Sequence, residues 1–102
     1  MIEIIKTSVF DAWLSDLRDQ RAKTRIGARL DRLASQNPGD VKPVGEGVSE
    51  MRIDHGPGYR IYFLQHGVVL VILLCGGDKS TQAKDVERAK TLAKAWKEAN
   101  DG

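Results

Sequence analysis

Residues 56–82 read GPGYRIYFLQHGVVLVILLCGGDKSTQ, and this stretch decides the fold. It opens with a glycine- and proline-containing turn, continues through two apolar segments, and ends in a Gly-Gly-Asp-Lys turn before helix-forming residues. The pattern predicts a hairpin of strands over 59–64 and 68–74, of which the second is apolar on both faces and therefore central. Arg60 and Lys79 are cations at the ends and faces of this small sheet, so we expect an external anion as their partner.

A further strand is predicted just before this stretch, over residues 49–54. One of its faces carries Ser49, Met51 and Ile53, and the other carries Glu50, Arg52 and Asp54. Pairing Ile53 with Tyr59 places Met51 opposite Ile61 and gives one apolar face. A slip of one residue would put Arg60 opposite Ile53 and mix polar with apolar residues on both faces, so the pattern fixes the register.

The same register sets Arg52 directly across from Arg60. Like charges directly opposite each other on a sheet are unfavourable, so something must offset the cost. Glu50 and Asp54 on the same face are one candidate, and a bound phosphate is another.

The remaining residues predict helices around these strands. A short strand over 2–5 precedes a helix capped by Ser8, and a second helix ends at Asn37-Pro38-Gly39. A short edge strand near 41–44 is an option. The last helix begins after Gly77-Asp78, and its predicted cap is Ser80 or Thr81.

The expected architecture is therefore α+β. It comprises an N-terminal strand, a helical hairpin, an antiparallel three-stranded meander that completes a four-stranded sheet, and a C-terminal helix. With 102 residues the chain is expected to form a single domain over 1–102.

Composition excludes several classes of protein. The chain is 41% hydrophobic and 29% charged, which is typical of a folded soluble protein and not of a disordered one. No apolar run reaches the roughly 18 residues of a membrane span, and no signal peptide is visible. Cys75 is the single cysteine, which excludes an internal disulfide and suits a reducing compartment. We therefore expect a cytoplasmic protein without membrane association.

The net charge of +2 is mild, so the distribution of the cations matters more than their sum. Basic residues crowd the predicted second helix and its approach: Arg18, Arg21, Lys23, Arg25, Arg29 and Arg32. Acidic residues are interspersed among them, and this favours an ordinary solvated face.

Three sequence motifs resemble one family closely. They are VSEMRI over 48–53, GPGYRIYF over 56–63 and LLCGGDKSTQ over 73–82. Together with the order of elements, they resemble the HigB-like (phage Gp49-like) addiction-module killer proteins of the RelE/ParE toxin superfamily. The resemblance covers nearly the whole chain, from Met1 to about Trp96.

The resemblance implies the toxin of a type II toxin–antitoxin pair, acting as a translation-dependent endoribonuclease on mRNA at the ribosome. It also implies neutralisation by a helix-turn-helix antitoxin of the HigA type, with operator DNA bound only through the complex. A ParE-like inhibitor of DNA gyrase, and a non-catalytic partner in autoregulation, are the alternatives.

Metal-free RNA cleavage requires stabilisation of a phosphorane and two proton transfers. Arg60 is the first candidate for the phosphate because its planar fork donates two hydrogen bonds and stays charged, and Arg52 is the second. Lys79 is a candidate for holding the phosphate or protonating the leaving group. Glu50 is a candidate base, with a role as charge partner of the arginines equally open.

Further candidates concern RNA contact. Tyr62 shares the face of Arg60 and suits base stacking, although packing competes. Gln82, in the first turn of the last helix, and His55, at the hairpin tip, are weaker candidates. No metal or cofactor is expected, because two distant histidines and one cysteine form no ligand set.

Overall fold

The computed structural model describes residues 2–100, which form one five-stranded sheet with three α-helices. The strands are β1 (Glu3–Lys6), β2 (Val41–Gly45), β3 (Val48–Ile53), β4 (Tyr59–His66) and β5 (Leu70–Gly77). Their order across the sheet is β1-β5-β4-β3-β2. Only β1 and β5 run parallel, and the other neighbours are antiparallel, so the sheet is mixed.

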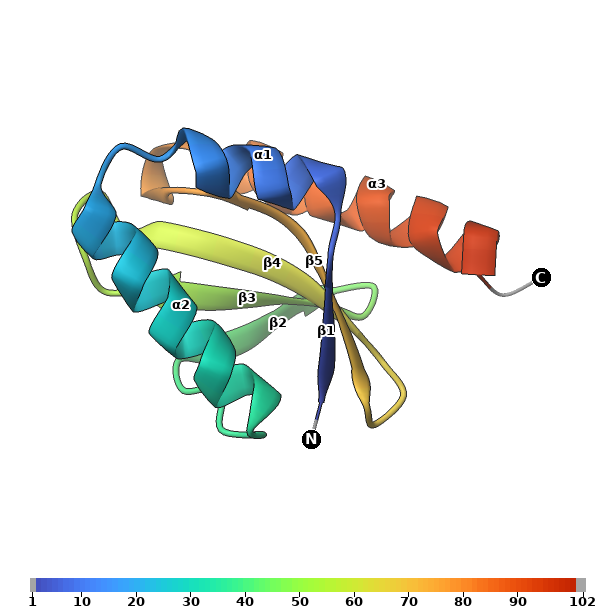
Figure 1. Ribbon diagram of the computed structural model, residues 1–102. Coiled ribbons are helices and arrows are strands. Elements are labelled where there is room, and N and C mark those ends of the chain that lie inside the picture. The colour runs from blue at the N-terminus through green and yellow to red at the C-terminus, as the bar shows by residue number, and fades with distance from the viewer. Residues whose placement is uncertain (1, 101–102) are drawn as a thin grey trace.

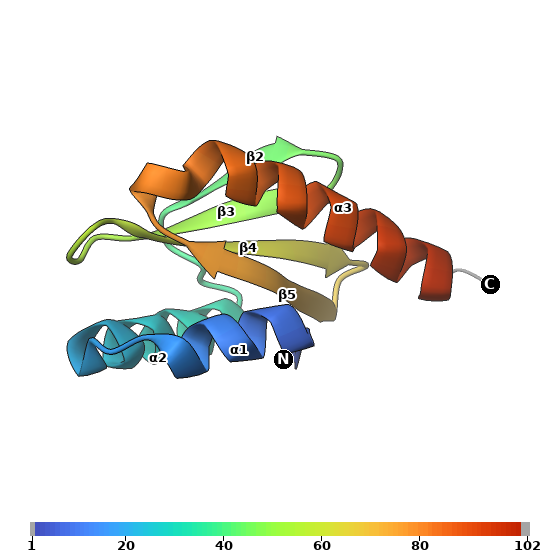
Figure 2. The same cartoon turned by 90° about the horizontal axis from the view of Figure 1, so that it is seen from above.

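The helices lie on both faces of this sheet. They are α1 (Ser8–Asp16), α2 (Gln20–Ala34) and α3 (Gln82–Asn100), with a 3₁₀ turn, η1 (Lys79–Thr81), before α3. Seen from above, α1 and α2 cover one face and α3 covers the other (Figures 1 and 2). The predicted α+β class is confirmed, but the predicted four-stranded sheet is wrong, because β2 pairs with β3 as a fifth, edge strand.

The predicted register of the hairpin is confirmed. Ile53 pairs with Tyr59 and Met51 with Ile61, and the same ladder puts Arg52 opposite Arg60. The predicted start of the third strand of the meander is wrong. Strand β5 begins at Leu70, because Val68 and Val69 lie in the turn, where they are 80% and 59% exposed.

A bulge in β5 changes which side chains face α3. Tyr62 pairs with Cys75, whereas Phe63 pairs with Leu73, so Leu74 is the extra residue. Leu74 and Cys75 therefore both join the core under α3. Burial raises the pKa of the Cys75 thiol to about 12, which fits the inert filler that the sequence predicts.

Two of the predicted helix caps are wrong by one or a few residues. Thr7, and not Ser8, is the N-cap of α1, and its hydroxyl accepts a hydrogen bond from the Phe10 N–H. Asp78 caps η1 through the Ser80 N–H, so neither Ser80 nor Thr81 is the cap. In both places a residue just upstream has an extended backbone and the side-chain acceptor that a cap needs.

Apolar side chains form one core on each face of the sheet. The core beneath α1 and α2 includes Phe10, Ile26 and Met51, and the core beneath α3 includes Leu64, Ile72 and Ala89. Among residues 2–100, Glu50 is the only charged residue buried in either layer.

Candidate functional site

The candidate site lies on the α3 face, where β3 and β4 extend beyond the start of α3. Strand alternation directs Glu50 and Arg52 of β3 to this face together with Arg60 and Tyr62 of β4. Helix α3 begins only at Gln82, so it covers Glu50 and Tyr62 and leaves the arginines at the open end.

Glu50 is the centre of the site. Its carboxylate is fully buried, and its Oε2 accepts hydrogen bonds from the Tyr62 hydroxyl at 3.1 Å and the Gln82 side-chain amide at 2.8 Å. Its Oε1 faces the two arginines instead. Because a buried carboxylate without partners is very costly, Glu50 and its four partner side chains form one mutually dependent cluster.

The arginines approach Glu50 through Nε and not through the ends of their forks. Arg52 Nε lies 3.5 Å and Arg60 Nε lies 3.8 Å from Glu50 Oε1. Both Nε atoms and Oε1 itself are buried without a hydrogen-bond partner in the described chain. One carboxylate thus faces two guanidinium groups at the open end of the sheet.

A hollow of about 280 Å³ adjoins these guanidinium groups, lined by Asp40, Arg52, Ile53, Asp54, Gly58 and Arg60. Gly58 has φ +78°, and an added Cβ there would lie 3.5 Å from both Arg60 Nη1 and Lys79 Cβ. The stem of the exposed Lys79 therefore borders the same loop as Arg60. Arg52 and Arg60 thus line one hollow, and Lys79 begins at the neighbouring loop, while the predicted phosphate-binding role of the three residues stays a prediction.

Tyr62 is on the predicted face but is fully buried. Burial raises the pKa of its hydroxyl, and the neighbouring Glu50 charge raises it further. Its ring is therefore covered in this structure and not presented for stacking. Gln82 occupies the first position of α3, as predicted, and its amide is committed to Glu50.

His55 does not join the cluster. Its Nε2 lies 2.9 Å from Asp19 Oδ2, and this contact ties the hairpin tip to the N-cap of α2. The hydrogen bond from His55 is the largest cause of the lowered pKa of Asp19.

Arg29 of α2 supports the site, and the sequence pattern did not single it out for this role. Its guanidinium donates to the carbonyl oxygen of Arg52 at 2.6 Å and to that of Pro38 at 3.0 Å. Gly39, with φ +77°, leaves room for this side chain, because a Cβ there would lie 3.1 Å from Arg29 Nη2. The only signal in the sequence was an arginine on the partly apolar side of a basic helix, close to a Pro-Gly turn.

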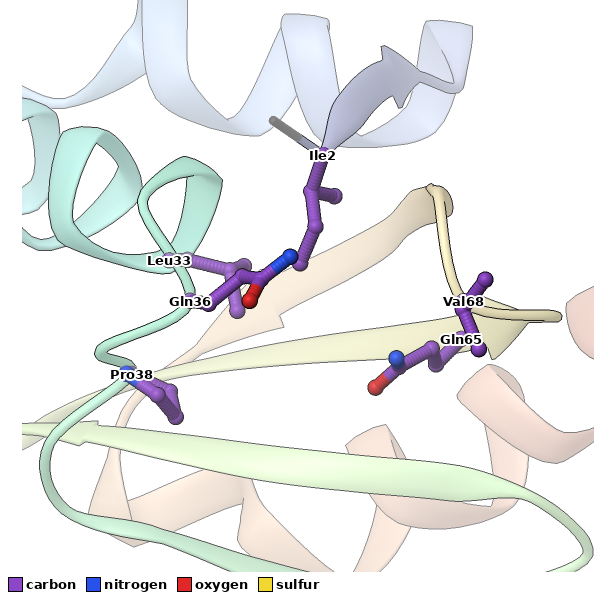
Figure 3. A pocket seen from close by; sticks show the side chains of 6 residues that line it. All are labelled: Ile2, Leu33, Gln36, Pro38, Gln65 and Val68. Carbon is purple, nitrogen blue, oxygen red and sulfur yellow. The ribbon is translucent and has the colours of Figure 1, made fainter.

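Two other features have little bearing on the site. A hollow at the far end of β4 is lined by apolar and uncharged groups of Ile2, Leu33, Gln36, Pro38, Gln65 and Val68 (Figure 3). Over residues 2–100, no group of three or more His, Cys, Asp or Glu side chains is placed to hold a metal ion. No helix in that range is long and apolar enough to cross a membrane.

Comparison with known sequences gives two findings. The sequence model of the family described as phage derived protein Gp49-like (DUF891) matches residues 12–99. A protein of Haemophilus influenzae described as uncharacterized is 56% identical over 92 residues, which cover 90% of this chain and 93% of that protein. Both matches include the strands and the helix start that build the arginine site. The chain belongs to the Gp49-like family of phage-derived, toxin-like proteins.

Proposed function

We propose that the chain is the toxin of a type II toxin–antitoxin pair and acts as a metal-independent endoribonuclease on mRNA at the ribosome. Membership of a toxin-like family supports the class of function. The observation that favours RNA cleavage is the arrangement of Arg52 and Arg60 around one buried carboxylate, beside a hollow that they line.

The chemistry divides among the residues as follows. The 2′-oxygen attacks the adjacent phosphorus, and the bond from phosphorus to the 5′-oxygen breaks, giving a 2′,3′-cyclic phosphate and a 5′-hydroxyl. Arg60 and Arg52 donate hydrogen bonds to the non-bridging oxygens, whose negative charge grows in the transition state. Lys79 gives a proton to the departing 5′-oxygen. The 2′-proton passes to water.

Glu50 acts in this scheme as a positioning residue and not as the base. A general base must come within about 3 Å of the proton that it removes, or reach it through one water molecule. Glu50 is fully buried and holds Tyr62 and Gln82 on its other oxygen. Its charge instead offsets part of the repulsion between the two guanidinium groups, and its Oε1 holds their Nε atoms beside the hollow that both arginines line.

The partner proposed for this toxin is a small helix-turn-helix antitoxin of the HigA type. The cytoplasm is the proposed compartment, since mRNA on ribosomes is the proposed target. The alternative target is DNA gyrase, but binding alone requires no pair of cations across a strand, and the site offers that pair.

The test is to express the chain without antitoxin and map mRNA 5′ ends, using wild type, Arg60→Ala and Arg88→Ala. Arg88 is an exposed arginine on α3 and serves as the control. We expect new 5′ ends with wild type and Arg88→Ala and none with Arg60→Ala. Intact transcripts in growth-arrested cells would disprove the ribonuclease function and point to gyrase, which a supercoiling assay then checks.

A further inference from the structure

The exposed arginines of α2 lie next to the candidate site, although the sequence pattern favoured a plain solvated face. A second hollow, of about 260 Å³, is lined by Arg25, Ala28, Arg29, Arg32, Ile53 and Asp54. Ile53 and Asp54 also line the hollow beside Arg52 and Arg60. The two hollows therefore meet at the end of β3.

The three cations in this second hollow outnumber the one carboxylate, that of Asp54, which lines it. Within residues 2–100, neither Arg25 nor Arg32 forms an ion pair, and both are exposed. Arg29 is already committed to backbone carbonyl groups. Burial lowers the pKa of Arg29 and the charge of Arg32 lowers it further, whereas the charge of Asp40 acts in the opposite direction.

The spacing of the free arginines suits a chain of anions. Arg25 and Arg32 are two turns apart on one helix, or about 10 Å along its axis. One strand of a nucleic acid presents a phosphate every 3.4 Å or so in a duplex, so this length faces more than one phosphate. Arg29 connects α2 directly to the backbone of Arg52, which holds this row in a fixed place relative to the site.

We propose that Arg25 and Arg32 form a second phosphate-binding surface, which holds the RNA strand where it leaves the Arg52–Arg60 hollow around the end of β3. This inference rests on the proposed function for the identity of the ligand as RNA. Asp54, exposed between the two hollows, is then a repulsive element on the path of the strand.

The test is a binding titration with the full chain and a 12-nucleotide single-stranded RNA that carries 2′-O-methyl groups and therefore resists cleavage. Fluorescence anisotropy at 50–200 mM salt compares wild type, Arg25→Gln/Arg32→Gln and Arg88→Gln/Lys94→Gln. The second pair removes the same charge from exposed positions on α3, across the sheet from α2 (Figure 2).

We expect the α2 pair to weaken binding about tenfold or more and to reduce the slope of log K against log salt by about 1.4, since each phosphate contact on a single strand contributes about 0.7. The α3 pair should change both quantities much less. Asp54→Asn should bind the RNA more tightly, by about two- to fivefold, and a misfolded protein cannot produce such a gain.

Equal losses for the two pairs would overturn the inference, because net charge alone would then explain the binding. A second titration uses polyglutamate in place of RNA. If the α2 variant binds RNA as wild type does but no longer binds polyglutamate, the inference is overturned in favour of an acidic protein partner.

Repeating the RNA titration in the Arg60→Ala background separates this inference from the proposed function. Suppose that Arg25→Gln/Arg32→Gln still weakens RNA binding in the Arg60→Ala background while wild type cleaves no mRNA in cells. The second phosphate-binding surface is then supported and the ribonuclease function is disproved. If Arg25→Gln/Arg32→Gln does not change RNA binding while mRNA cleavage depends on Arg60, the second surface is disproved and the ribonuclease function is supported.

Discussion

Arg52 and Arg60 are direct cross-strand partners, and both direct Nε toward the same oxygen of Glu50, at 3.5 and 3.8 Å. Paired like charges normally destabilise a sheet. Here one fully buried carboxylate offsets the repulsion only in part, because one negative charge faces two positive ones. Asp40 and Asp54 line the same hollow, so the site offers a phosphate the hydrogen-bond donors of two guanidinium groups and not a large excess of positive charge.

Arg60→Ala should reduce mRNA cleavage by about 100- to 1,000-fold, the usual effect of removing one preorganised donor to a developing charge. The mRNA cleavage by Arg60→Lys should lie between that of wild type and that of Arg60→Ala, because lysine keeps the charge and loses the bidentate donor. The measurement is the yield of new mRNA 5′ ends after induction, with Arg88→Ala as control. Equal activity of the Lys and Ala variants would contradict a role for the fork.

Glu50→Gln should destabilise the fold by about 3 kcal/mol in urea denaturation, since removal of one partner leaves buried groups without a counter-charge. We expect this low end of the range because the Arg52 side chain is 38% exposed and partly screened by solvent. Glu87→Gln, at an exposed position of α3, is the control.

The same variant distinguishes positioning from base catalysis. If Glu50 only positions the arginines, Glu50→Gln lowers cleavage by a similar factor at every pH between 5.5 and 8.5. Disappearance of an acidic limb present in the wild-type profile would identify Glu50 as the base and contradict the mechanism proposed above.

The strand pairing was predictable because it depends on local alternation. Met51 and Ile53 alternate with Glu50, Arg52 and Asp54, the residues from 59 to 63 alternate in the same way, and only one register keeps the apolar face intact. Candidates Glu50, Arg52, Arg60 and Tyr62 could therefore be placed on one face from the sequence alone.

Contacts between distant segments could not be predicted in the same way. The covering of Tyr62 by α3, the Arg29 contact with the Arg52 carbonyl and the His55–Asp19 pair each depend on how a helix docks on the sheet. Nothing in the alternation of a single strand fixes those positions. The bulge at Leu74 could not be predicted for a related reason. In a strand whose residues are all apolar, the sequence pattern does not show where the side chains switch from one face of the sheet to the other.

His55→Ala should leave mRNA cleavage within about threefold of wild type, because His55 contacts the α2 N-cap and not the arginine cluster. The pKa of Asp19 should rise toward its ordinary value in the variant. The lowered pKa of Asp19 contributes stability above its unfolded-state pKa, and this contribution is lost as pH falls through the folded-state value. NMR titration of the Asp19 carboxyl measures the shift. Loss of cleavage in a folded His55→Ala protein would instead place His55 in contact with RNA.

Stability should fall at alkaline pH partly through Cys75. The pKa of its thiol is raised from 9.0 to about 12 by burial, so its contribution is complete below pH 9 and is lost between pH 9 and 12. Between pH 8 and 10.5, wild type should therefore lose about 2 kcal/mol more than Cys75→Ala. Urea denaturation under reducing conditions measures both proteins. Parallel losses would show that the thiol is not held neutral by the fold.

Gly76→Ala and Gly27→Ala should change stability in opposite directions. A Cβ at Gly76 would overlap Cε3 of Trp13, so the indole or β5 must move, at a cost of about 1–3 kcal/mol. Gly27 lies inside α2 with no atom within 4 Å of an added Cβ, so alanine there should stabilise the protein by up to about 1 kcal/mol through helix propensity. Urea denaturation of both variants provides the measurement, and each is the control for the other. Wild-type stability in Gly76→Ala would mean that α1 does not pack closely on β5, which would contradict the arrangement of α1 against the sheet.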